Sequence, residues 1–204
     1  TPAAEILAKN VKYEVSSSEF ELSCFGENYG KMEIHLPGRH NVLNALGAIS
    51  IAHHLGVKPQ NMRKGLSEFV GVGRRLQTLF KEGEFEVIDD YGHHPTEIRV
   101  TLETLKGTRP NKKLVAIFEP HRYSRTRDCW NQFFHCFNSA DELYLTPIYA
   151  ASEGPIEEIQ SSRLVQDINQ LHPNFAHELK RVDEIGCLIE NLRQSHPKTT
   201  VAVL

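Results

Sequence analysis

Titratable side chains crowd the stretch "DDYGHHP" at residues 89–95, directly after the strand-like segment "FEVID". Because successive strand residues face opposite sides, Asp89 and Asp90 cannot both point into one site unless the strand has already ended. We therefore expect one functional and one structural aspartate. His93 and His94 precede Pro95, a favoured first helical residue, where free backbone N–H groups disfavour a charged imidazolium. Both histidines should be mostly neutral hydrogen-bonding groups.

The alternative is an ordinary turn with a histidine N-cap and solvated acids, since titratable clusters also arise for structural reasons.

A second group of chemical side chains lies in "EPHRYSRT", residues 119–126. Here Arg122 and Arg125 are three residues apart, with His121 beside them. Guanidinium groups grip carboxylates and phosphates through two parallel hydrogen bonds, so this loop predicts a site for an anionic group. The alternative is a pair of surface arginines that balance nearby acids.

A third loop, "PIYAASEGP" at residues 147–155, is less informative. Tyr149 and Glu153 could line a pocket, although a loop bounded by proline and glycine is by default a surface loop.

Each of these loops follows an apolar run that we interpret as a strand, and helix-length segments separate the runs. The expected strands are 85–89, 113–118, 142–146 and 200–204, and the expected helices are 95–106, 127–137, 161–172 and 182–194. This alternation predicts a Rossmann-like α/β fold with right-handed crossovers and a mostly parallel sheet covered on both faces. Ligands bind beyond the carboxyl ends of such strands, where the three loops lie.

The first 76 residues have a different pattern. Short alternating segments between residues 11 and 36 predict a small antiparallel sheet. A helix with apolar residues from Val42 should stop at Gly56, and a second helix should open at Pro59 and carry Met62, Leu66 and Phe69. We place a domain boundary near Leu76, which divides the chain into residues 1–76 and 77–204.

Composition excludes several classes of protein. The 204 residues carry 23 Lys and Arg against 26 Asp and Glu, a net charge of -3 that argues against a nucleic-acid partner. The four cysteines form no CxxC pair, and no apolar run approaches the roughly 20 residues of a membrane span. We expect a reduced, cytoplasmic chain with no membrane partner. With neither an initiator Met nor a signal peptide, the chain is expected to begin inside a longer reading frame.

Five blocks of residues, in this order and spacing, resemble the Mur ligase family. They are "LPGRHNVLNALGAISIAHHLGV", "GVGRRLQ", "VIDDYGHHPTEI", "FEPHRYSRTRD" and "PIYAASE". Within that family they are most similar to the members that join L-alanine to UDP-N-acetylmuramate in peptidoglycan synthesis. The block "PHRYSRT" favours these members over the alternative, the murein-peptide recycling ligases.

The resemblance implies an ATP- and Mg²⁺-dependent ligase that activates the sugar nucleotide's carboxylate as an acyl phosphate, which the alanine amine then attacks. Residues 1–76 would be the last portion of the central ATP-binding domain, and residues 77–204 the C-terminal domain. The resemblance also assigns Asn41 and Asn44 to the adenine region, Arg75 to the nucleotide phosphates or ribose, and Asp90 to the ribose hydroxyls. The side chains expected to bind substrates are Tyr91, His93, His121, Arg122, Arg125 and Tyr149, of which His93, Arg122 and Arg125 would be catalytic.

The sequence also departs from the family pattern, because it contains no GxxxxGK[ST] phosphate loop. That loop, the magnesium ligands and the UDP-binding domain are expected upstream, and relatives continue past "VAVL", so this fragment should be inactive by itself. Two other hypotheses remain open. One is a metal-dependent phosphoesterase with Asp89, Asp90, His93 and His94 as ligands, and the other is a non-catalytic nucleotide-binding module.

Overall fold

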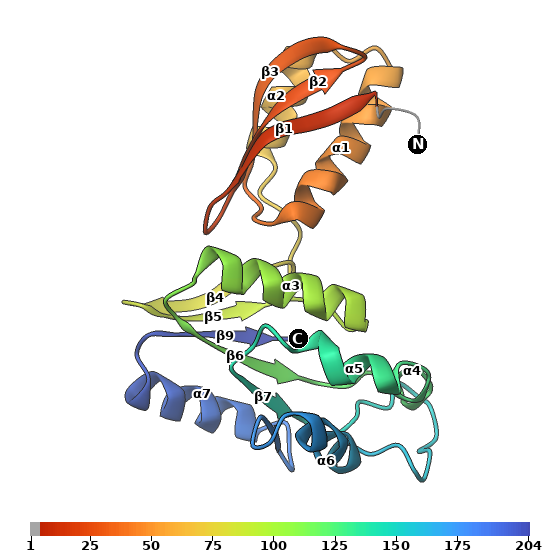
Figure 1. Ribbon diagram of the computed structural model, residues 1–204, viewed down its shortest axis with the longest axis vertical. Coiled ribbons are helices and arrows are strands. Elements are labelled where there is room, and N and C mark those ends of the chain that lie inside the picture. Colours follow the sequence, from red (N-terminus) through yellow and green to blue (C-terminus); the bar gives the residue numbers. More distant parts are fainter. Residues whose placement is uncertain (1–4) are drawn as a thin grey trace. The chain divides into compact units, whose positions relative to one another are not determined.

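The computed structural model describes residues 5–204, and the chain divides into two compact units, residues 1–73 and 74–204 (Figure 1). The boundary that we expected near Leu76 lies just inside the second unit. Each unit has a hydrophobic core of its own. None of the described helices is long and apolar enough to cross a membrane.

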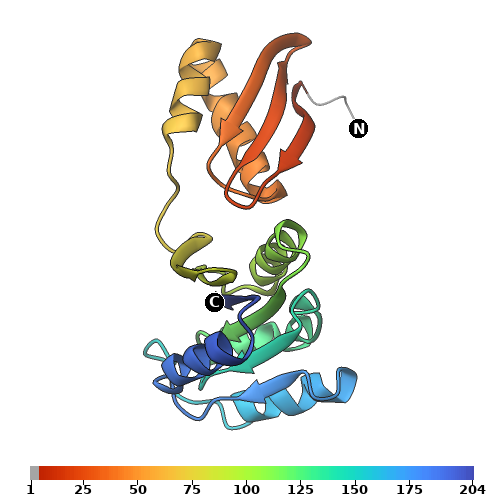
Figure 2. The same ribbon diagram turned by 90° about the vertical axis from the view of Figure 1, so that its left-hand side faces the viewer.

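The first unit contains a three-stranded antiparallel sheet with two helices against one face (Figure 2). Its elements are β1 (Ile6–Tyr13), β2 (Ser18–Cys24), β3 (Glu27–Ile34), α1 (Arg39–His54) and α2 (Pro59–Glu68). In β2 the side chains of Phe20, Leu22 and Cys24 are buried in alternation, as expected for a sheet covered on one face. The predicted small antiparallel sheet is therefore confirmed, although β1 begins earlier than Val11.

Helix α1 buries Val42, Ala45 and Ile49 against this sheet and ends before Gly56, whose φ of 74° is left-handed. Helix α2 is shorter than predicted. Phe69 follows it in an extended conformation and is 47% exposed, so placing Phe69 on the helix was wrong. The chain leaves the helix there, and Gly71, two residues later, has a φ of 92°.

The second unit contains a six-stranded sheet in the order β4-β5-β9-β6-β7-β8, most of which can be followed in Figure 1. Its strands are β4 (Gln77–Glu82), β5 (Phe85–Asp89), β6 (Lys113–Phe118), β7 (Glu142–Leu145), β8 (Ala176–Glu178) and β9 (Thr199–Val203). All neighbouring pairs are parallel except β4 with β5, which confirms the mostly parallel sheet. We missed β4 because every one of its side chains is exposed, which leaves no alternation to read. Strand β8 is only three residues long.

Helices cover both faces of this sheet, as predicted, but unequally. They are α3 (Pro95–Thr108), α4 (Tyr123–Asp128), α5 (Trp130–Cys136), α6 (Ser161–Leu171) and α7 (Glu184–Ser195). Residues of α3, α5 and α6 share one core cluster with the sheet, and residues of α7 share the cluster on the other face. Cys129 and Cys136 are buried in the first cluster.

One predicted helix was wrong, and another ends one residue later than predicted. The single helix expected over 127–137 is two helices, because Cys129 adopts φ −103° and ψ 7° and redirects the chain between α4 and α5. Helix α3 does not stop at Gly107 but continues to Thr108. The next residue, Arg109, precedes Pro110, which disfavours the helical conformation at Arg109, and its side chain forms a buried ion pair with Glu86 of β5.

Candidate active site

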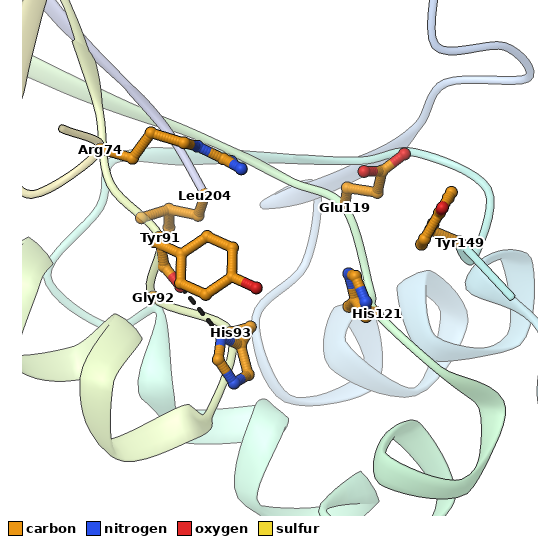
Figure 3. Close-up of a pocket in the computed structure, with 8 residues that line it drawn as sticks. All are labelled: Arg74, Tyr91, Gly92, His93, Glu119, His121, Tyr149 and Leu204. Carbon is orange, nitrogen blue, oxygen red and sulfur yellow. Dashed lines mark hydrogen bonds between the residues drawn. The ribbon is translucent and has the colours of Figure 1, made fainter. Parts of the chain in front are cut away.

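The candidate site lies where β5, β9 and β6 end at the same edge of the sheet. The N–H of Asp90, after β5, donates to Val203 O at 2.9 Å, and the N–H of Glu119, after β6, donates to Leu204 O at 3.0 Å. Residues that follow β5 and β6 are thereby held on either side of the end of β9. A pocket of about 310 Å³ opens there, lined by Arg74, Tyr91, Gly92, His93, Glu119, His121, Tyr149 and Leu204 (Figure 3).

The two histidines of the first loop make different contacts. His93 lines the pocket, and its Nδ1 lies 2.9 Å from Tyr91 O. A carbonyl oxygen only accepts, so Nδ1 carries the proton, and Nε2 of the neutral ring is left as an acceptor. His94 is the N-cap of α3, and its Nδ1 accepts from Thr96 N at 3.3 Å. The alternative reading, a histidine N-cap, thus describes His94 but not His93.

Glu97 completes the start of α3. Its carboxylate accepts from the backbone N–H groups of His93 at 3.1 Å and His94 at 3.2 Å. Burial raises the pKa of Glu97, but these two hydrogen bonds and the positive charge nearby outweigh it, so the pKa is lowered. An ionised Glu97 therefore tethers the backbone that carries His93 to the first turn of α3.

The two aspartates also differ. Asp90 is 4% exposed, and its Oδ1 accepts from Gly92 N at 2.9 Å and from Thr101 Oγ1 at 3.1 Å. Its Oδ2 accepts from Leu76 N at 2.9 Å. Asp89 instead pairs with Arg74, whose Nε lies 3.2 Å from Asp89 Oδ2. Asp90 ties together three segments of the unit, while Asp89 holds an arginine that lines the pocket.

Aromatic rings run across the pocket. Ring centroids lie 5.2 Å apart for Tyr91 and His93, 6.4 Å for His93 and His121, and 4.9 Å for His121 and Tyr149. The guanidinium groups of Arg74 and Arg75 lie 5.0 and 5.9 Å from the centroid of the Tyr91 ring. These distances suit cation–π contacts, which hold positive charge beside the pocket.

The electrostatics favour an uncharged imidazole at His121. Burial lowers its pKa, and the neighbouring positive charges of Arg125, Arg122 and Arg74 lower it further. The pKa of Glu119 moves the other way: burial raises it, and the charge of Arg74 only partly offsets that rise. The pocket thus combines a neutral imidazole with a carboxylate that binds its proton more tightly than usual.

The second and third loops support each other. His121 and Tyr149 form an isolated parallel β-bridge, and Arg122 N donates to Tyr149 O at 2.8 Å. Glu153 accepts from Ser124 N at 2.8 Å and from Ser124 Oγ at 2.7 Å. The third loop is therefore a support for the second, with Tyr149 in the pocket wall and Glu153 at the start of α4.

The structure brings only part of the predicted site together. Four of the predicted residues line the pocket: Tyr91, His93, His121 and Tyr149. Arg75, Arg122 and Arg125 do not line it; Arg122 has a φ of 74°, and Arg125 Nη1 donates to His121 O at 3.3 Å.

Asn41 and Asn44 belong to the first unit, in the first turns of α1. The Asn41 amide donates to Pro37 O at 2.8 Å, and Asn44 is exposed.

Sequence reasoning missed four lining residues, namely Arg74, Gly92, Glu119 and Leu204. A signal existed for two of them. Arg74 is adjacent to the predicted Arg75, and Glu119 is the first residue after the buried strand β6, which is where functional side chains concentrate in parallel sheets. Leu204 could not be anticipated without knowing that β9 inserts between β5 and β6.

The family assignment rests on residues 74–204. They match the model of the Mur ligase, glutamate ligase domain. The chain belongs to the Mur ligase family. All eight residues that line the pocket lie within the matched segment, so the pocket is part of the Mur ligase domain itself.

Relatives within this family have similar sequences. A UDP-N-acetylmuramate–L-alanine ligase of Solidesulfovibrio magneticus is 44% identical over 164 residues, which are 77% of this chain and 36% of that protein. One of Salinibacter ruber is 40% identical over 192 residues, 94% of this chain and 40% of that protein. The chain therefore spans well under half the length of these Mur ligases.

A crystal structure of the UDP-N-acetylmuramate–alanine ligase MurC from Thermotoga maritima has a similar fold. It superposes with a TM-score of 0.78 at 28% sequence identity, and the match covers all of this chain and 42% of that one.

Proposed function

We propose that this chain is the C-terminal part of an ATP-dependent, cytoplasmic ligase that joins L-alanine to UDP-N-acetylmuramate in peptidoglycan synthesis. The observation that carries this proposal is the identity of 44% and 40% to relatives that bear the name of that ligase. Residues 1–76 would be the last portion of a central ATP-binding domain, and residues 77–204 the C-terminal domain. The division of the fold into two compact units supports this arrangement.

The proposed reaction has two steps. A carboxylate oxygen of the sugar nucleotide attacks the γ-phosphorus of ATP, and ADP leaves. The amine of L-alanine then attacks the carbonyl carbon of the acyl phosphate, inorganic phosphate leaves, and the amine loses a proton. An amine attacks only in its neutral form, so this step needs groups that can accept a proton or a hydrogen bond.

Residues of the pocket, together with two arginines of the second loop, suit the second step. His93 has its Nδ1 proton committed to Tyr91 O, which leaves Nε2 as the acceptor, and we assign it to the reacting amine. His121, Tyr91 and Tyr149 would orient the substrates. Arg122 and Arg125 would neutralise the carboxylate or the acyl phosphate, because guanidinium groups bind such anions in a two-pronged geometry.

The nucleotide would be held by other residues. We assign Asn41 and Asn44 to adenine, Arg75 to the phosphates or ribose, and Asp90 to the ribose hydroxyls. The hydrogen bonds of Asp90 to Leu76, Gly92 and Thr101 already use much of its acceptor capacity. Any bond from Asp90 to ribose would thus add to its role of joining these segments.

Magnesium, which ATP-dependent ligases of this kind require, does not fit the residues present. Within residues 5–204 no three His, Cys, Asp or Glu side chains gather closely enough to hold a metal ion. The magnesium ligands would lie upstream. The four side chains that the phosphoesterase hypothesis needs around one metal ion make separate contacts instead. Asp89 pairs with Arg74, and Asp90 is buried. His93 lines the pocket, and His94 caps α3.

The test is an assay of the full-length protein encoded by the gene. Steady-state release of ADP should require UDP-N-acetylmuramate and a nucleophile, and L-alanine should be the preferred amino acid. Replacement of L-alanine by a murein tripeptide distinguishes the recycling ligase, since preference for the tripeptide would move the protein to that class. ATP binding without any ADP release would favour the non-catalytic nucleotide-binding module instead.

A further inference from the structure

Glu119 is the carboxylate of the pocket to which the proposed reaction assigns no role. It follows β6 directly, and its backbone is fixed by the hydrogen bond to Leu204 O. Figure 3 shows its side chain in the pocket wall beside Tyr149 and above His121, with Arg74 reaching in from the other side.

The carboxylate of Glu119 is half-buried without a close partner. In the part of the chain that the structure describes, it makes no hydrogen bond and no ion pair within 4.0 Å. Arg74, the cation that acts on it, is paired with Asp89 instead. Burying an unpaired carboxylate costs free energy, and burial accordingly raises the pKa of Glu119. Such a group in a pocket is typical of a binding site that is completed by its ligand.

The surroundings of Glu119 suit a small cation. The ring of Tyr149, which no guanidinium among the described residues contacts, lines the same pocket, and aromatic faces attract ammonium groups. An ammonium has three N–H donors and no acceptor, so it fits a carboxylate and the acceptor nitrogens of neutral imidazoles. A volume of about 310 Å³ lies at the small end of the range for ligand pockets.

We propose that Glu119 binds the ammonium group of the incoming amino acid and so selects an α-amine over a neutral nucleophile. This inference rests on the proposed function, because it assigns the amino acid to this pocket. Glu119 is then a specificity-determining residue: it holds the amino acid before the amine is deprotonated and takes no part in activating the carboxylate.

The experiment compares two nucleophiles in the full-length protein. L-alanine carries an ammonium group at neutral pH, whereas hydroxylamine is largely neutral there and traps acyl phosphates as hydroxamates. Glu119→Gln should raise the Michaelis constant for L-alanine about tenfold or more, the effect of losing one charge-assisted hydrogen bond. Hydroxamate formation, and the Michaelis constants for ATP and UDP-N-acetylmuramate, should stay within about twofold of the parent.

Glu103→Gln is the matched control, because it removes the same charge from the exposed surface of α3, where Glu103 pairs with Arg99. It should leave all these constants unchanged. Glu119→Asp keeps the charge on a shorter side chain and should raise the alanine constant by less than Glu119→Gln. If Glu119→Gln does not fold, the aspartate variant provides the test by itself.

The outcomes separate the two proposals. An unchanged alanine constant in Glu119→Gln, or in Glu119→Asp if only that variant folds, overturns the role of Glu119 and leaves the proposed function standing. An equal loss of alanine and hydroxylamine turnover also overturns it, since the residue would then act on activation. If the parent enzyme turns over neither nucleophile, the proposed function fails, and this inference fails with it.

Discussion

The buried carboxylate of Asp90 joins segments that surround the pocket, although Asp90 itself does not line the pocket. Its two oxygens accept hydrogen bonds from Leu76, Gly92 and Thr101, which come from the start of the unit, the first loop and α3. A residue larger than glycine would not fit at position 92, because a Cβ there would lie 2.9 Å from Asp90 Oδ1. The pocket therefore depends on a residue that does not line it.

We predict that Asp90→Ala destabilises the second unit strongly. The variant leaves buried donors without an acceptor, and each one costs about 1 to 3 kcal/mol. Thermal unfolding of the 204-residue chain measures the effect, with Asp89→Ala as control because that side chain pairs with a partly exposed arginine. Equal melting temperatures for the two variants would contradict the structural role of Asp90.

We also predict that Arg122→Lys and Arg125→Lys in the full-length protein each lower kcat/KM for L-alanine or UDP-N-acetylmuramate. Lysine keeps the charge but loses the two-pronged geometry. Arg127→Lys is the control, since Arg127 lies on α4 with Arg125 and pairs with the adjacent, exposed Asp128. Melting temperatures should barely change. Parent-like kinetics in both variants would remove these arginines from the active site.

At the level of secondary-structure elements, the site depends on how loops and helix ends are fastened. Glu153 fixes the start of α4 through Ser124, and Glu97 fixes the start of α3 through the backbone of His93 and His94. At the opposite end of α3, Arg109 and Lys112 bind Glu86 of β5. These carboxylates hold the elements that present the pocket residues.

Glu153 does not line the pocket, so removal of its carboxylate should act on the pocket only through the conformation of the second loop. We predict that Glu153→Gln lowers kcat/KM of the full-length enzyme, because Ser124 N loses a charged acceptor and Arg122 and His121 lie on the same loop. Glu157→Gln, in the exposed stretch that follows, is the matched control and should behave like the parent. A fall in both variants alike would point to general loss of negative charge instead.

The Glu86 cluster predicts how stability depends on pH. Glu86 is 2% exposed. Burial alone would raise its pKa, but hydrogen bonds from Arg109, Lys112 and Thr200 outweigh burial and lower it to about 2. A carboxyl with a lowered folded-state pKa stabilises the fold above its unfolded pKa, and this stability is lost as pH falls toward about 2.

We predict that Glu86→Gln removes this acid-labile part of the stability. Between pH 4.5 and about 2 the parent should lose on the order of 3 kcal/mol more than the variant, the equivalent of the shift in pKa. Denaturant unfolding at several pH values measures the difference. Parallel pH profiles for parent and variant would show that Glu86 does not contribute in this way.

The molecule as a whole consists of two units with separate cores, and the pocket belongs to the second. We predict that the 204-residue chain alone neither hydrolyses ATP nor joins L-alanine to the sugar nucleotide. Its sequence contains no GxxxxGK[ST] loop, and phosphoryl transfer depends on groups that cradle the phosphates and the metal. ADP release by the purified chain, measured against the full-length protein, would falsify this prediction.

The sequence by itself determined the α/β class, the small antiparallel sheet and the loops from which residues line the pocket. These features depend on hydrophobic period and on turn residues, which are local properties. Residues that follow buried strands could be named as candidates for the same reason, and His93, His121 and Tyr149 do line one pocket, together with Tyr91, which only the family resemblance had indicated.

Only the tertiary structure decided which contacts each of two adjacent residues of the same type makes. Asp89 and Asp90 are alike in the sequence, as are His93 and His94, and their roles differ because of partners far along the chain, such as Leu76 and Thr101 for Asp90. The insertion of β9 between β5 and β6 likewise brings Leu204 beside Glu119. Pairings between distant segments form because the whole sheet must bury both of its faces, and no local pattern of residues records them.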